Sequence, residues 1–280
     1  MKLPAIDVIK SFLTNPMKIP ANIFWRIPRT ISDKRHIFVV GAPRSGTTLL
    51  QSIISVHPNV KSLDEETGFF MLRDIFKLRL DGVDSEMVAQ AQQASDDIVD
   101  YYDAVAFIVT KNDPAVRFLE KTPQHVLRLG FITKFFPNAQ VIHIVRDGRD
   151  CYCSAKGHKG VVQGKDVKSY AKYWEKCIRS RLLCDSSQIF DVKYEDLTSD
   201  PETVMRQVMH FLGETFIMDQ IDPAKYSRNK MSTKKEFTKL NSKISIASQN
   251  RWKEEMSSDE KDIFLLIARQ CLSSFGYEYE

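Results

Sequence analysis

A glycine-bounded loop between an apolar strand and an amphipathic helix constrains the fold of this chain most. Residues 37–40 (IFVV) predict a short buried strand, and residues 47–56 predict a helix whose leucines and isoleucines share one face. The loop between them is GAPRSG, residues 41–46. In this arrangement, backbone N–H groups and a helix N-terminus converge on one point, which predicts a cradle for a phosphate-like anion.

The loop has the glycine spacing of a nucleotide P-loop but departs from it at one position. Thr47 stands where the P-loop lysine, which reaches the β- and γ-phosphates, is expected. The cation is instead Arg44, whose guanidinium suits a bidentate contact with a phosphate or a sulfate. The departure argues against hydrolysis of ATP or GTP.

A second charged motif, RDGRD at residues 146–150, follows the apolar run QVIHIV, and Ser154 comes soon after it. Because ligands of open α/β sheets bind at the carboxyl ends of the strands, Arg146, Arg149 and Ser154 are candidates to hold a second phosphate. The alternative is a charged turn in which the arginines and aspartates pair with one another.

Apolar runs and amphipathic segments alternate along the rest of the chain. This alternation predicts βαβ units, and so an α/β fold: a helix-rich, P-loop-like three-layer αβα domain around a central parallel sheet. We assign residues 36–280 to a single domain and residues 1–35, which four prolines interrupt, to an N-terminal arm. Strands are expected at 37–40, 117–120, 140–145 and 189–194, and helices at 47–56, 66–80, 84–108, 123–136, 148–156, 166–184, 201–212 and 259–274.

The composition is that of a soluble globular protein. The net charge of +4 suits an anionic ligand and does not require nucleic acid, which we do not expect as a partner. No membrane span or signal peptide is apparent, so we expect a cytoplasmic protein. The five cysteines follow no zinc-binding pattern, and no metal is expected. The arm mixes apolar residues with lysines and arginines, which predicts either packing across the domain or contact with a membrane surface.

The two motifs together, PRSGTT and then VRDGRD, resemble those of the sulfotransferases that use 3'-phosphoadenosine-5'-phosphosulfate (PAPS). The first is similar to their 5'-phosphosulfate loop and the second to their 3'-phosphate motif. The resemblance covers residues 36–275. It implies PAPS as co-substrate, 3'-phosphoadenosine-5'-phosphate (PAP) as product, and transfer of the sulfuryl group to an acceptor hydroxyl.

The resemblance also implies which residues bind the nucleotide. Arg44, in the loop similar to the 5'-phosphosulfate loop, is assigned to the catalytic residues as well as to the nucleotide ligands. The implied nucleotide ligands are Arg44, Ser45, Gly46, Thr47 and Thr48 in the first loop, Arg146 and Ser154 in the second motif, Tyr194 in VKYEDL, and Ser242 and Arg251 in a late loop.

Two further residues are assigned to the chemistry. Glu66, in DEET, resembles the catalytic glutamate of the tyrosylprotein sulfotransferases, and a carboxylate can serve as a general base. Asp64, Glu65 and His125 are the alternatives, although His125 is expected on a helix surface. Lys121, in EKTP, resembles the lysine that stabilises the leaving oxygen, where fixed positive charge contributes strongly to catalysis.

The acceptor is left open between two patterns. DEET resembles a motif of the tyrosylprotein enzymes. The segments ETGFF and EKTPQH together resemble motifs of generic bacterial sulfotransferases that are thought to act on glycans or lipids. We expect a carbohydrate or glycolipid hydroxyl, with a peptidyl tyrosine as the alternative. A P-loop nucleotide kinase and a non-catalytic PAP-binding protein are the alternatives of other classes, and a homodimer stays open.

Overall fold

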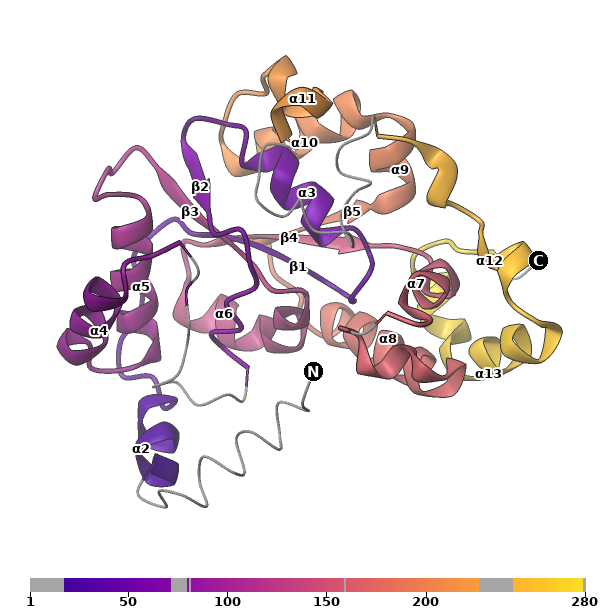
Figure 1. The fold of residues 1–280 in the computed structure, drawn as a ribbon, viewed down its shortest axis with the longest axis horizontal. Helices are drawn as coiled ribbons and strands as arrows, with labels where there is room; N and C mark the ends of the chain where they lie inside the picture. The colour runs from indigo at the N-terminus through magenta and orange to yellow at the C-terminus, as the bar shows by residue number, and fades with distance from the viewer. Residues whose placement is uncertain (1–17, 72–79, 81, 159, 227–243, 279–280) are drawn as a thin grey trace.

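A five-stranded parallel sheet forms the centre of the computed structural model, which describes residues 18–71, 80, 82–158, 160–226 and 244–278 (Figure 1). The strand order is β2-β3-β1-β4-β5, and every pairing is parallel. The strands are β1 (Ile37–Gly41), β2 (Val60–Ser62), β3 (Arg117–Lys121), β4 (Gln140–Val145) and β5 (Ile189–Lys193).

The central strand β1 is buried along its whole length, as its unbroken apolar sequence predicts. Its register places Val39 opposite Lys121 of β3 and Gly41 opposite Ile144 of β4. The carboxyl ends of β1, β3 and β4 therefore meet at one edge of the sheet, and the loops that follow them are neighbours.

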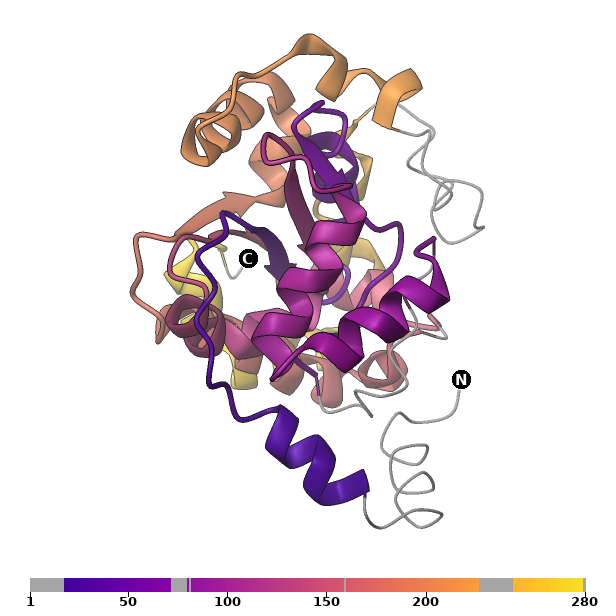
Figure 2. The same cartoon turned by 90° about the vertical axis from the view of Figure 1, so that its left-hand side faces the viewer.

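Helices cover both faces of the sheet (Figures 1 and 2). One face packs against α3 (Thr47–Ile54), α9 (Tyr194–Ser199) and α10 (Pro201–Leu212). The α10 helix starts and stops as its sequence predicts, because Asp200 caps it, Pro201 begins it and Gly213 ends it at φ 72°.

The opposite face carries most of the remaining helices and the larger apolar cluster, which includes Phe38, Tyr102, Phe136 and Trp174. These helices are α4 (Ser85–Ala94), α5 (Ile98–Val109), α6 (Leu129–Phe135), α7 (Gly148–Ala155), α8 (Val167–Leu182) and α13 (Ser258–Ser274). Of the shorter helices, η2 (Pro123–Arg128) and η3 (Val162–Lys165) pack against α8, and α12 (Trp252–Glu255) packs against α7. On the other face, η4 (Met218–Ile221) and α11 (Pro223–Tyr226) lie beside α3 and α10, and η7 (Ile246–Ser248) packs against α9. The predicted three-layer α/β architecture with a parallel sheet is confirmed.

Several local predictions differ from the structure. Strand β2 was not predicted, and the expected helix at 84–108 is two helices, because Asp97 caps a new one by accepting from Val99 N and Asp100 N. The expected helix at 123–136 begins as the 3-10 helix η2. Residues 66–71 are not helical, and most of the rest of the helix expected at 66–80 lies outside the described residues.

The N-terminal arm contains α2 (Lys18–Trp25), at one end of the molecule (Figure 2). The chain after α2 is tied to the domain at Asp97, whose carboxylate accepts from Thr30 N at 2.8 Å and from Thr30 Oγ1 at 2.9 Å. Ile23, Phe24 and Ile27 are nevertheless exposed. Among the described residues, no helix is long and apolar enough to cross a membrane.

Candidate active site

The loop after β1 makes a sharp turn, which requires a glycine at its start and two residues with positive φ angles. A Cβ on Gly41 would lie 2.4 Å from the Ile144 carbonyl oxygen, so the position requires glycine. Arg44 and Gly46 both take positive φ angles, 74° and 105°. Gly46 is the N-cap of α3, and a Cβ there would meet the Tyr194 ring at 2.6 Å.

This geometry presents several hydrogen-bond donors to one point. The first-turn N–H groups of an α-helix have no partner within the helix, and no side chain caps α3. The hydroxyl of Ser45 is buried without a hydrogen-bond partner among the described residues. Thr47 is buried and Thr48 half-buried in the same turn. An anion placed at this helix end would satisfy these donors, so the loop fits a phosphate or phosphosulfate.

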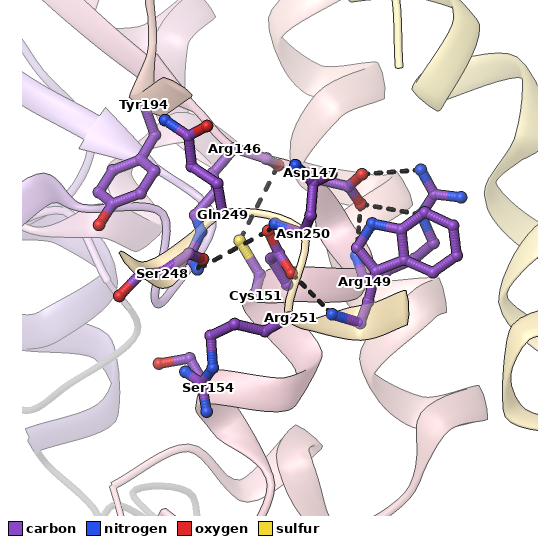
Figure 3. A network of polar contacts seen from close by, with 12 residues as sticks. Arg146, Asp147, Arg149, Cys151, Ser154, Tyr194, Ser248, Gln249, Asn250 and Arg251 are labelled. Carbon is purple, nitrogen blue, oxygen red and sulfur yellow. Dashed lines mark hydrogen bonds and ion pairs between the residues drawn. The ribbon is translucent and has the colours of Figure 1, made fainter. Parts of the chain in front are cut away.

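Arg146 lies at the end of β4 and connects three segments of the chain (Figure 3). Its Nη1 donates to the Arg44 carbonyl oxygen at 3.2 Å, and its Nη2 donates to the Ser248 carbonyl oxygen. Its guanidinium carbon lies 4.5 Å from the centroid of the Tyr194 ring. Its Nε is buried without a hydrogen-bond partner among the described residues. The side chain is thus oriented beside the first loop with one donor still to be satisfied.

The two sequence motifs meet directly in the structure. Arg44 Nε donates to Ser154 Oγ at 3.1 Å, and Arg44 Nη1 lies 3.4 Å from Nε2 of His158. Ser154 is in α7, which begins at Gly148 inside the RDGRD motif. Arg44, Arg146, Ser154 and Tyr194 therefore form one cluster at the carboxyl edge of the sheet. His158 was not singled out in the sequence.

Arg149 does not join this cluster, which corrects the prediction that both arginines of the motif face a phosphate. It donates to Asp147 at 3.0 and 2.7 Å (Figure 3). Its guanidinium carbon lies 3.6 Å from the centroid of the Trp252 ring. Internal Arg–Asp pairing therefore describes Arg149. Arg146 lies 3.9 Å from Asp150 as well, but it also contacts the first loop through the Arg44 carbonyl oxygen. The difference arises because Asp147 is the N-cap of α7 and fixes the Arg149 backbone as well.

A late segment closes over the second motif. The carboxylate of Asp150 accepts from Asn250 N at 2.8 Å and from Trp252 N at 3.0 Å. Arg251 is in this segment, where its guanidinium pairs with Glu255 at 2.7 Å. Ser242, the other residue expected from the late part of the chain, lies outside the described residues. The contact of Arg146 with the Ser248 carbonyl was not predicted, because a backbone oxygen leaves no signature in the sequence.

The predicted catalytic pair is in contact. Lys121 Nζ lies 3.3 Å from Glu66 Oε1. The lysine side chain is fully buried, whereas that of the glutamate is 39% exposed. Lys121 is the last residue of β3 and is paired with Val39 of β1, two residues before Gly41. Strand β3 therefore ends beside the first loop.

His125 is buried, contrary to the expectation of a surface histidine. Its Nδ1 is 2.8 Å from Glu120 Oε2, and its Nε2 accepts from Phe70 N at 3.2 Å. With both ring nitrogens engaged inside the protein, His125 is a poor candidate for the general base. Across the described residues, no group of three or more His, Cys, Asp or Glu side chains is arranged to hold a metal ion.

The comparisons with known proteins agree with this geometry. Residues 36–218 match the model of the Sulfotransferase family. The chain belongs to this family. Protein-tyrosine sulfotransferase 1 of Danio rerio is 32% identical to it over 199 residues, which cover 65% of this chain and 54% of that protein. The chain spans about half the length of the curated relatives it matches.

Solved sulfotransferases share the fold. The sulfotransferase domain of the olefin synthase of Synechococcus PCC 7002 superposes with a TM-score of 0.69 at 21% identity, covering 91% of this chain and 98% of that domain. Mouse sulfotransferase SULT7A1, solved in complex with PAP, superposes with a TM-score of 0.51 at 16% identity, covering 88% of this chain and 91% of that one. At these identities the likeness establishes the fold.

Proposed function

We propose that the protein transfers a sulfuryl group from PAPS to a tyrosine hydroxyl of a peptide or protein. The observation that carries the reaction is the single cluster of Arg44, Arg146 and Ser154 beside an uncapped helix end. Family membership supports the reaction class, and the P-loop kinase alternative finds no support in it. The name of the Danio rerio relative favours tyrosine over the carbohydrate or glycolipid acceptor expected from the sequence.

Each phosphate-like end of the nucleotide has its own donors. When bound, PAPS supplies an activated sulfuryl group on its 5'-phosphate. The N–H groups at the start of α3, the Ser45 hydroxyl and Arg44 hold that end. Arg146, through its unsatisfied Nε, and Ser154 hold the 3'-phosphate. Guanidinium donors suit these anions because their N–H groups match two oxygens at once.

The remaining residues act on the two oxygens between which the sulfuryl group moves. Glu66, partly exposed, accepts the proton of the incoming hydroxyl. Lys121, buried at the end of β3, meets the negative charge that develops on the departing phosphate. Their 3.3 Å separation brings the proposed base and the proposed cation to one place, where both can act on the same bound sulfuryl group.

The binding half of the proposal is tested by thermal unfolding with PAP, AMP and ATP plus Mg²⁺. PAP at a hundred times its dissociation constant should raise the free energy of unfolding by about 2.7 kcal/mol. AMP, which differs by the missing 3'-phosphate, should stabilise far less. Arg146→Ala should abolish the difference, and Arg206→Ala, an exposed arginine paired with Glu202 on α10, should keep it. Stabilisation by ATP and Mg²⁺ but not by PAP would overturn the proposal.

The acceptor half is tested with PAPS and matched substrates. An acidic peptide with one tyrosine should gain sulfate, and the same peptide with phenylalanine should not. Lys121→Ala should reduce turnover on the tyrosine peptide by about a hundredfold or more, because a fixed charge at the developing oxyanion contributes that much. Sulfation of an oligosaccharide or glycolipid without sulfation of the peptide would reverse the choice of acceptor.

A further inference from the structure

A fully buried polar cluster lies directly behind the Glu66–Lys121 contact and has no part in the mechanism above. Its centre is Glu120, whose Oε1 accepts from Thr67 Oγ1 at 2.8 Å and from Thr122 Oγ1 at 2.6 Å. Its Oε2 lies 2.8 Å from Nδ1 of His125. The side chains of Glu120 and His125 are both inaccessible to solvent. Burying a carboxylate destabilises the folded state unless the carboxylate is fully hydrogen-bonded. A carboxylate kept at this buried position therefore points to a functional role for the cluster.

The cluster receives the backbone of the turn that follows Glu66. Gly68 N donates to Thr122 Oγ1 at 3.0 Å, and Phe70 N donates to His125 Nε2 at 3.2 Å. Phe69 N donates to Thr67 Oγ1 at 3.3 Å. The turn, which contains Gly68 at φ 64°, is therefore held by the side chains of Thr122, between β3 and η2, and of His125 in η2.

These contacts fix the protonation pattern of the cluster. Because Phe70 N–H donates to Nε2, the ring proton of His125 is on Nδ1 and points at Glu120. Burial would raise the pKa of Glu120, but the His125 ring and the hydroxyls of Thr122 and Thr67 outweigh it and hold that pKa below its usual value. Glu120 is therefore an ionised acceptor of three hydrogen bonds.

We propose that Thr67, Glu120 and His125 are positioning residues that hold Glu66 against Lys121 for sulfuryl transfer. Thr67 directly follows Glu66, and Lys121 directly follows Glu120. One buried hydrogen bond, Thr67 to Glu120, thus joins the two segments one residue away from the 3.3 Å catalytic contact. Glu66 is partly exposed, and the buried neighbours hold its backbone in place. This inference rests on the proposed function, because Glu66 and Lys121 act only in that reaction.

The variant Thr67→Val tests the inference, since it keeps the shape of the side chain and removes the donor to Glu120. It should lower kcat by about tenfold to a hundredfold, because small misplacements of catalytic groups cost that much, and leave the PAP dissociation constant unchanged. Thr67→Ser restores the donor and should recover most of the kcat. Thr133→Val removes a hydroxyl that donates to Leu129 O in α6, far from the sheet edge, and should leave kcat unchanged.

A double-mutant cycle shows whether the effect passes through Glu66. In a Glu66→Gln background, Thr67→Val should lower kcat no further, whereas independent effects would multiply. A normal kcat in Thr67→Val, or a loss that multiplies with that of Glu66→Gln, would overturn the inference.

Amide hydrogen exchange gives a readout that needs no turnover. Thr67→Val should speed exchange in the peptide covering residues 64–71, and Thr133→Val should not. Unchanged exchange would overturn the positioning role by itself. A wild-type protein that binds PAP yet sulfates no acceptor would instead refute the proposed function, while the exchange result would still decide whether Thr67 anchors this turn.

Discussion

The backbone of Arg44 predicts an unusual order of stability among its variants. At φ 74°, a side chain with a Cβ costs about 1–2 kcal/mol relative to an ordinary backbone conformation, and glycine escapes most of this cost. Arg44→Gly and Arg44→Ala both remove the guanidinium contacts to Ser154 and His158, so their difference isolates the backbone contribution. Glycine also raises the conformational entropy of the unfolded chain, which destabilises the folded state by about 0.4–1 kcal/mol and offsets part of this gain. Arg44→Gly should therefore be more stable than Arg44→Ala by about 1 kcal/mol.

The assay is equilibrium unfolding in urea, followed by circular dichroism, on both variants. Gly130 of α6 supplies the matched control, because no atom lies within 4 Å of a Cβ added there and its φ is not positive. Gly130→Ala should therefore stabilise the protein by about 0.5–1 kcal/mol. The same exchange of glycine for alanine thus has opposite signs at the two positions.

The result that would refute this reasoning is an Arg44→Ala variant as stable as Arg44→Gly, with Gly130→Ala behaving as expected. That outcome would mean that the loop relaxes to an ordinary φ once the guanidinium is gone. Both Arg44 variants should also lose about a hundredfold or more in sulfuryl transfer, because both lack the cation that the proposed function places at the 5'-end of the nucleotide. The effect of backbone strain on stability and the effect of the guanidinium on catalysis can thus be measured separately at Arg44.

Three further predictions follow from contacts elsewhere. Gly46→Ala should destabilise the protein by about 2–3 kcal/mol or more in urea unfolding and weaken PAP binding, since its Cβ would strike the Tyr194 ring at 2.6 Å; an unchanged midpoint would contradict this. The pKa values of Glu120 and Asp191 lie below their usual values in the folded state, for Asp191 because the hydrogen bonds of His143 and Arg181 outweigh its burial. These two carboxylates therefore bind more protons in the unfolded state, so their contribution to the free energy of unfolding should fall as the pH drops below about 4.5. Glu120→Gln and Asp191→Asn should flatten this fall, and an unchanged pH dependence in both variants would argue against these contacts. If the arm contacts membranes, the protein should co-sediment with vesicles containing phosphatidylserine, and Phe24→Ser, which removes an exposed ring, should reduce the bound fraction; equal binding by both proteins would exclude this surface.

The parts of the site that could be predicted from the sequence are those fixed by strand ends. An apolar run followed by a glycine loop places Arg44 at the carboxyl edge of a parallel sheet, and QVIHIV places Arg146 at the same edge. Their convergence follows from the strand order, in which β1 and β4 are neighbours, and the Arg44–Ser154 and Arg146–Arg44 contacts form where the two strands end.

The parts that could not be predicted depend on contacts without a sequence pattern. Strand β2 has three residues, too few for any periodicity, and is recognisable only by its pairing with β3. His125 lies in a 3-10 helix, where the 3.6-residue period that separates buried from exposed positions does not apply. Arg149 was assigned to the site because its motif follows a strand end, whereas the structure pairs it with Asp147, the N-cap of α7.

The contact of Arg146 with Ser248 has a consequence for the time at which the site forms during synthesis. The two residues are 102 positions apart, as are Asp150 and Trp252, which are also hydrogen-bonded. A ribosome adds about 5–20 residues per second, so at least several seconds pass between the synthesis of α7 and that of the segment that closes over it. The whole parallel sheet can emerge first, but nucleotide binding cannot assist the nascent chain until that last segment has been made.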